Sequence, residues 1–228
     1  ANAVSTEPDE FTASGYKMKP SNFISVVDLS LRPIRVIDRV VVGTMPSGIS
    51  IDKVGKFGVV ANRKDSTVSI LSINGTSVVV TDTVNVGGGV TAVAISPDGR
   101  KAFAVKNAEH KVAVLKIGVS GKATYEGSDI PVGLYPWAIT LSQDGNRAIV
   151  TNIGYNSASD GNEDTVSILD LSVSPPRVVQ HLSVGDAPEG VVISPNGRFA
   201  AVSLLAGSFA VPKGAWYRKE VGRFSVLQ

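Results

Sequence analysis

Oxygen-bearing side chains gather in one short polar stretch of the chain, residues 157–164. Asp160, Asn162 and Asp164 stand at alternating positions within it. Carboxylate and amide oxygens at alternating positions are the ligands that Ca²⁺ takes in loop sites. The stretch lacks the full spacing of a calcium loop and the bidentate glutamate that closes one. The residues therefore favour a solvated turn, with a calcium loop at these three positions as the alternative.

Imidazole chemistry is limited to His110 and His181, the only two histidines among the 228 residues. We expect His110 in a short connection and His181 on an outer strand, and neither stands in a Ser, His and Asp pattern. Two histidines placed in this way make a poor metal site. The chain has no cysteine, which excludes disulfides and thiolate catalysis and leaves its redox compartment open. The sequence assigns no catalytic residue and no cofactor beyond the alternative calcium ion.

These residues lie within a sequence repeat, whose skeleton of shared residues occurs four times along the chain. Its turn glycines are Gly55, Gly99, Gly145 and Gly197, spaced roughly 44 to 52 residues apart. Each copy opens with a valine-glycine pair, and three copies place a proline four residues after the valine. The second copy has Val90 in that place. A period of this length indicates a repeat array.

Each copy contains four short strand patterns separated by turn residues. The apolar run after the proline is rich in β-branched residues and too short for a helix, as in 138–141. The turn that follows reads Ser-Pro-Asp-Gly at 96–99 and Ser-Pro-Asn-Gly at 194–197, which is typical of a hairpin. The pattern predicts one all-β domain over residues 1–228, a β-propeller of four-stranded antiparallel blades. The expected blade boundaries lie near residues 43, 87, 133 and 185.

The second strand of two copies ends in a motif that points to a known family. It reads Val59-Val60-Ala61-Asn62 in one copy and Ile149-Val150-Thr151-Asn152 in another. Together with the Val-Gly-x-x-Pro and Ser-Pro-Asp-Gly elements, it resembles the YVTN repeat family of β-propellers. Lys106 and Leu204 depart from the asparagine of the motif. The resemblance implies about seven blades, a periplasmic or cell-surface location, and relatives among lactonase-like enzymes and amine dehydrogenase subunits.

Side chains that follow the repeat proline are the candidates for ligand contact. This position begins the innermost strand, where propeller blades converge on a central channel. It is occupied by Ser47, Thr91, Trp137 and Glu189, and Tyr135 lies beside Trp137. We expect these five residues around one channel mouth, where they contact a ligand. The alternative is that Trp137 fills the channel.

Three connections between second and third strands are long, at 3–22, 153–164 and 204–223. In a propeller with this strand order they emerge on the same face as the Val-Gly-x-x-Pro connections. Long loops gathered over a rigid scaffold usually carry function. Decoration without a function is the alternative.

The two ends of the chain fall within copies of the repeat. Ala1-Asn2 matches the end of a second strand, and 224–227 matches a third strand. We therefore expect an interior fragment of about four blades out of about seven. Its partner would then be the complementary remainder of the propeller or another copy.

Charge and hydropathy favour neither a nucleic-acid partner nor a membrane span. The 22 basic and 20 acidic residues give a net charge of +2, too small and too dispersed to favour nucleic acid. No run of 18 apolar residues exists, so we expect no membrane span.

Two functions remain open at this point. The first is an extracytoplasmic binding or scaffold module whose loop-decorated face meets a protein, a glycan or another cell-envelope partner. The second is a lactonase-like hydrolase or a dehydrogenase-associated propeller with its site at the channel mouth. In the lactonase-like reading, Glu189 and a base such as Arg63 or His110 would act by general acid-base chemistry.

Overall fold

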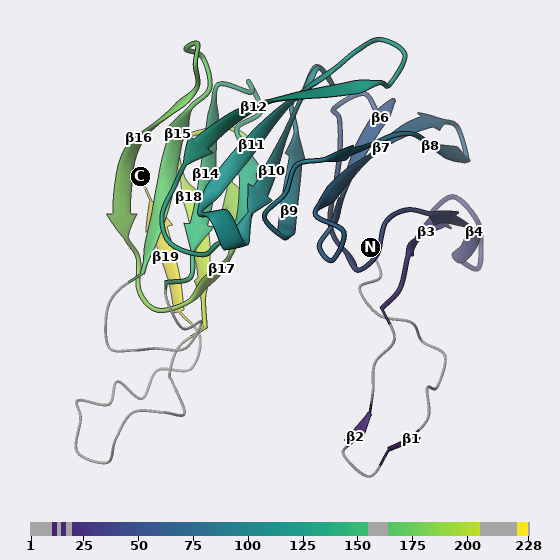
Figure 1. Cartoon of the computed structure of the whole chain (residues 1–228), viewed down its shortest axis with the longest axis horizontal. Helices are drawn as coiled ribbons and strands as arrows, with labels where there is room; N and C mark the ends of the chain where they lie inside the picture. The colour runs from purple at the N-terminus through teal and green to yellow at the C-terminus, as the bar shows by residue number, and fades with distance from the viewer. Residues whose placement is uncertain (1–10, 13–14, 17–19, 155–163, 206–222, 228) are drawn as a thin grey trace. The chain divides into compact units, whose positions relative to one another are not determined.

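The computed structural model of the chain describes residues 11–12, 15–16, 20–154, 164–205 and 223–227, which are built from antiparallel sheets (Figure 1). The predicted Asp160 and Asn162 lie outside the described residues, as does most of each long connection. The chain divides into two compact units. The first comprises residues 1–104 and 115–126, and the second comprises residues 105–114 and 127–228.

Three sheets contain four strands each, hydrogen-bonded in chain order, as a propeller blade requires. The first is β5 (Pro46–Ile51), β6 (Phe57–Asn62), β7 (Thr67–Asn74) and β8 (Ser77–Asn85). The second is β9 (Val90–Ile95), β10 (Lys101–Lys106), β11 (Lys111–Ile117) and β12 (Ala123–Pro131), with the short 3₁₀ helix η1 (Asn107–Glu109) between β10 and β11. The third is β13 (Pro136–Leu141), β14 (Arg147–Asn152), β15 (Thr165–Asp170) and β16 (Arg177–Ser183).

Three smaller sheets complete the described residues. β3 (Phe23–Asp28) pairs with β4 (Arg35–Val41), and β17 (Pro188–Ile193), β18 (Ala200–Leu204) and β19 (Arg223–Leu227) form a three-stranded sheet. β1 (Phe11–Thr12) and β2 (Gly15–Tyr16) form a short hairpin. The strand assignments confirm the predicted all-β fold and its four-stranded antiparallel blades.

The turn between the first and second strands of each copy is fixed by its glycine. Gly55, Gly99, Gly145 and Gly197 have φ between 69° and 73°, a left-handed conformation that glycine adopts without steric cost. Each glycine N–H donates to the carbonyl three residues earlier, at 2.8 to 3.0 Å. The predicted hairpins are therefore present at all four turns.

Apolar residues from neighbouring sheets form the core of each unit. In the first unit, Ile24 and Val40 of the β3–β4 sheet cluster with Val60 and Leu71 of the next sheet. In the second unit, five buried residues from β14, β15 and β18 form the corresponding cluster: Ile149, Val166, Ala200, Val202 and Leu204. Strand β6 is buried along its whole length because both faces of its sheet are covered. No helix among the described residues is long and apolar enough to cross a membrane.

Candidate functional site

The residue just before the third strand of three copies makes the same pair of hydrogen bonds. The carbonyls of Ser66, His110 and Asp164 each accept the N–H of the valine that opens the following Val-Gly loop, at 3.0 Å. Their side chains accept a second N–H three residues further along that loop. Ser66 Oγ accepts from Gly89 at 3.2 Å, His110 Nδ1 from Tyr135 at 3.0 Å, and Asp164 Oδ2 from Ala187 at 2.8 Å. We call this pair of bonds the loop clasp.

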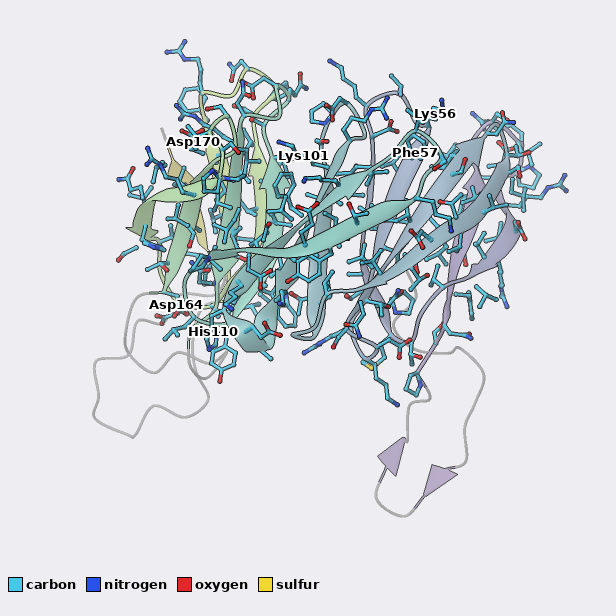
Figure 2. The ribbon with its side chains drawn as sticks, turned by 45° about the horizontal axis from the view of Figure 1, so that its top comes forward. Lys56, Phe57, Lys101, His110, Asp164 and Asp170 are labelled. Carbon is cyan, nitrogen blue, oxygen red and sulfur yellow. The ribbon has the colours of Figure 1, made fainter. Side chains whose placement is uncertain are left out.

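The opposite side of each loop is held by backbone bonds to the next connection between second and third strands. Ile153 N–H donates to the Tyr135 carbonyl, and Leu205 N–H to the Ala187 carbonyl, both at 3.1 Å. The two kinds of connection therefore emerge at the same end of the strands, as the sequence predicted. We call this end of the second unit, built from residues 107–110, 132–137 and 184–189 with Ile153, Gly154 and Asp164, the loop face. Figure 2 shows His110 and Asp164 at this end and Asp170 at the other.

The backbone before the repeat proline is strained in three copies. Met45, Tyr135 and Ala187 have φ of 56°, 49° and 47°, in the left-handed region. This conformation costs a non-glycine residue roughly 1–2 kcal/mol. The second copy places Gly89 there, with φ of 61°. Such strain persists only where the surroundings impose it, and it clusters at ligand-binding sites. At Tyr135 and Ala187 the clasp imposes it, whereas the Met45 N–H donates to the Ser21 carbonyl at 2.7 Å. The side chain at this position differs in every copy.

His110 and Tyr135 form the most specific side-chain pair of the loop face. His110 ends η1 and is itself left-handed, with φ of 57° and ψ of 42°. Its ring meets the Tyr135 ring edge-on, with 4.7 Å between centroids and 76° between planes. Asn107 adds a bond from its amide Nδ2 to the Pro136 carbonyl at 2.9 Å. Both rings are half-buried, so they are held in place and still reach the surface.

The five predicted channel-mouth residues divide between the two units. In the first unit, Ser47 Oγ donates to the Thr91 carbonyl at 2.8 Å, and Thr91 is buried. In the second unit, Trp137 and Glu189 are both half-buried and are the second residues of β13 and β17, which are neighbouring strands. The structure thus associates Ser47 with Thr91, and it associates Tyr135 and Trp137 with the strand next to that of Glu189.

Asp164 is the described member of the three-residue calcium-loop alternative, and one of its carboxylate oxygens takes part in the loop clasp. Its Oδ2 accepts the Ala187 N–H in the loop clasp. A side chain at Gly154 would collide with Asp164, so the carboxylate is enclosed by the backbone of its own connection. Among the described residues, no group of three or more His, Cys, Asp or Glu side chains could hold a metal ion.

A polar chain crosses the second, third and fourth strands of two sheets. Asn62 Nδ2 donates to Ser69 Oγ at 2.9 Å, and Ser69 Oγ lies 3.3 Å from Thr83 Oγ1. Asn152 Nδ2 donates to Ser167 Oγ at 3.0 Å, which lies 3.1 Å from His181 Nδ1. His181 therefore belongs to this polar chain of hydrogen-bonded side chains and not to the loop face. The asparagine that ends the second strand, Asn62 or Asn152, connects the strands of its blade at a buried position.

In the second copy of the repeat, an ion pair takes the place of this polar chain. Lys106 stands in the asparagine position, and its Nζ lies 2.8 Å from Asp129 Oδ2 and 2.7 Å from Glu109 Oε2. The Lys106 side chain is only 4% exposed and that of Asp129 12%. Ala113 occupies the place of the serine, which leaves room for the longer side chain. Sequence reasoning noted Lys106 only as a departure from the motif and missed Asp129, although the change from serine to Ala113 was visible.

No protein-family model matches the chain, and no curated protein matches it. Its fold is similar to that of several solved structures. Hydrazine synthase of Kuenenia stuttgartiensis matches with a TM-score of 0.71 and 21% identity over 90% of this chain and 56% of that one. The periplasmic gluconolactonase of Pseudomonas aeruginosa matches with a TM-score of 0.57 and 20% identity over 74% and 53%.

A third similar structure is the β-propeller domain of Cps50 (Swd1) from Myceliophteria thermophila. It matches with a TM-score of 0.61 and 12% identity over 80% of this chain and 56% of that one. The chain thus spans a little over half the length of each of the three. At these identities the likeness shows the fold, which is that of a β-propeller.

Proposed function

We propose that the chain is an extracytoplasmic β-propeller module that binds a partner through the loop face. The observation that supports this most strongly is the loop clasp. It holds Gly89, Tyr135 and Ala187 in the same left-handed conformation, although these residues have nothing in common. A scaffold that imposes strain at one position while varying its side chain is typical of a binding surface.

The partner is a component of the cell envelope, a glycan or a protein. The extracytoplasmic location rests on the resemblance of the repeats to the YVTN family. The similar fold of a periplasmic gluconolactonase is compatible with that location.

Sedimentation with an isolated cell-envelope fraction tests this function. Trp137→Ala on the loop face should weaken co-sedimentation about tenfold, as loss of an aromatic contact does at many interfaces. Phe199→Ala is the matched control because Phe199 is a 39% exposed aromatic next to the turn at the opposite end of the strands. Equal binding by both variants, with unchanged melting temperatures, would contradict the proposal.

A lactonase-like hydrolase is the second candidate. It is supported by the fold likeness to a gluconolactonase and by a carboxylate, Glu189, at the start of a strand next to β13. Glu189 would act by general acid-base chemistry on a lactone. The test is hydrolysis of a panel of lactones by the chain and by Glu189→Gln. Activity that this change abolishes would establish the hydrolase, and its absence in the unaltered chain would remove this candidate.

A further inference from the structure

His110 differs from the other two clasp residues because its neutral ring has a hydrogen-bond donor on an atom that the clasp does not use. Ser66, His110 and Asp164 each use one side-chain atom to accept a loop N–H. The imidazole has a second polar atom, Nε2, at a fixed position across a rigid ring. No hydrogen bond from Nε2 is found within the described part of the chain.

The loop clasp determines which ring nitrogen of the neutral imidazole carries the proton. The N–H of Tyr135 is a backbone donor and cannot accept, so the ring atom 3.0 Å from it must be a nitrogen with a free lone pair. That nitrogen is Nδ1, and the proton of the neutral ring is therefore on Nε2. This assignment does not depend on a choice of ring orientation, because a ring carbon could not accept the bond.

The orientation of this donor is fixed from two sides. The clasp holds Nδ1, and the Tyr135 ring packs edge-on against the imidazole at 4.7 Å between centroids. The left-handed backbone at both residues costs energy that a free loop would release. A donor held in this way is preorganised. Binding a ligand therefore costs little further ordering of the side chain.

The geometry points to a saccharide as the ligand of this position, with His110 as the residue that recognises it. The Nε2–H donates a hydrogen bond to an acceptor oxygen of the sugar, and the adjoining Tyr135 ring contacts its apolar face. Sugars combine these two features, since their hydroxyl and ring oxygens accept bonds while their C–H faces pack on aromatic rings. This inference rests on the proposed binding function of the loop face and names the ligand class.

The same geometry excludes His110 as the general base of the lactonase-like scheme. A general base needs a free lone pair within reach of the proton that it abstracts. Nδ1 has its lone pair committed to Tyr135, and Nε2 carries the proton. In the lactonase-like candidate the base is therefore another group, and His110 acts as a donor to a substrate oxygen.

The protonation state of the ring can be measured directly. Long-range ¹H–¹⁵N correlation spectra of the labelled protein at neutral pH distinguish the two neutral tautomers. The expected result is the Nε2–H form at His110. Finding the Nδ1–H form would overturn the inference whatever the protein binds.

The repeat supplies a matched substitution for the binding test. His110→Ser copies Ser66, which keeps the clasp acceptor in the same left-handed conformation (φ 56°) but has no donor at the position of Nε2. The probes are glucose, N-acetylglucosamine and gluconate, followed by shifts of the His110 ring resonances. With the probe that binds best, we expect His110→Ser to raise Kd about tenfold. The melting temperature should stay close to that of the unaltered protein.

His181→Ser is the control, because His181 is the other imidazole and bonds Ser167 in the polar chain of its blade. It should leave the Kd for the probe unchanged. Equal affinity of His110→Ser and the unaltered chain, or no response of His110 to any of the three probes, would overturn the saccharide assignment. If Trp137→Ala still weakens envelope binding in that case, the proposed function stands and only the ligand class is wrong.

Discussion

At the scale of single residues, the asparagine that ends the second strand has unequal surroundings in the two copies that contain it. Asn62 Oδ1 accepts the Gly43 N–H at 3.1 Å, and its Nδ2 donates to Thr67 and Ser69. Asn152 makes the two corresponding donor bonds, but its buried Oδ1 has no hydrogen-bond partner among the described residues. Burying a polar atom without a partner costs desolvation free energy that no hydrogen bond offsets.

Alanine at the two positions should therefore have different effects on stability. We expect Asn62→Ala to lower the free energy of unfolding by about 2–3 kcal/mol and Asn152→Ala by about 1 kcal/mol less, because only the first removes a satisfied acceptor. Urea unfolding of the two variants measures the difference. An equal loss, or a larger loss at Asn152, would show that Oδ1 of Asn152 is satisfied in solution.

The left-handed position before the repeat proline gives a second residue-scale prediction. A Cβ at Gly89 would meet no atom within 4 Å, so Gly89→Ala tests the backbone conformation alone. We expect a loss of about 1 kcal/mol in unfolding free energy, since φ there is 61°. Gly118→Ala is the control, because that residue lacks a positive φ and its Cβ would make an ordinary contact. The control should be neutral or slightly stabilising, and a similar loss in both variants would argue against strain.

At the scale of the sheet, three blades connect their strands with two kinds of polar chemistry. Two use amide and hydroxyl groups, and the β9–β12 sheet uses Lys106 with Asp129 and Glu109. A buried ion pair adds little net stability, because desolvation offsets the attraction. Removing Lys106 is far more costly, since it takes the nearest cation from the largely buried Asp129 carboxylate and leaves it Lys111, whose Nζ lies 3.9 Å away.

Lys106→Met should therefore lower the free energy of unfolding by about 3–5 kcal/mol. Lys116→Met is the matched control, because Lys116 pairs with Glu126 at 3.0 Å while its side chain is 67% exposed. Exposed pairs contribute about 0–1 kcal/mol. The double variant Lys106→Met with Asp129→Leu should recover most of the loss. Chemical denaturation of the four proteins decides, and a small effect of Lys106→Met alone would contradict the buried pair.

At the scale of the whole molecule, one carboxylate–serine pairing recurs in both units. Ser96 and Ser142 lower the pKa of Asp98 and Asp144 below the ordinary value of 3.8 by donating hydrogen bonds to them in the repeat turns. Ser30 and Ser172 lower the pKa of Asp28 and Asp170 in the same way, after the third strands. Each of these bonds is made to the ionised carboxylate and favours it.

These shifts predict a loss of stability in acid. A lowered folded-state pKa stabilises the fold above the unfolded value of 3.8, and this contribution disappears as the pH falls through the lower folded value. The free energy of unfolding should therefore decline as the pH drops from about 5 to about 2.5. Urea titrations across this range test the slope. Asp98→Asn with Asp144→Asn should flatten it, and an unchanged slope would exclude these turns as its source.

The propeller could be predicted from the sequence because its signals are local. A turn such as Ser96 to Gly99 needs a glycine at positive φ, and the four consecutive residues of the turn are enough to predict it. Strand alternation and the recurrence of the skeleton likewise depend on near neighbours along the chain. These features gave the strands, their order within each blade and the common end at which the loops emerge.

The loop clasp could be found only in the tertiary structure, because it joins residues that are far apart in the chain. His110 meets Tyr135 across an entire pair of strands, and Asp164 meets Ala187 in the same way. Lys106 likewise finds Asp129 across the width of its sheet. The sequence identified Tyr135 and both histidines as candidates, and it supplied no reason to pair them. A hydrogen bond depends on atoms within about 3 Å, and folding decides which atoms those are.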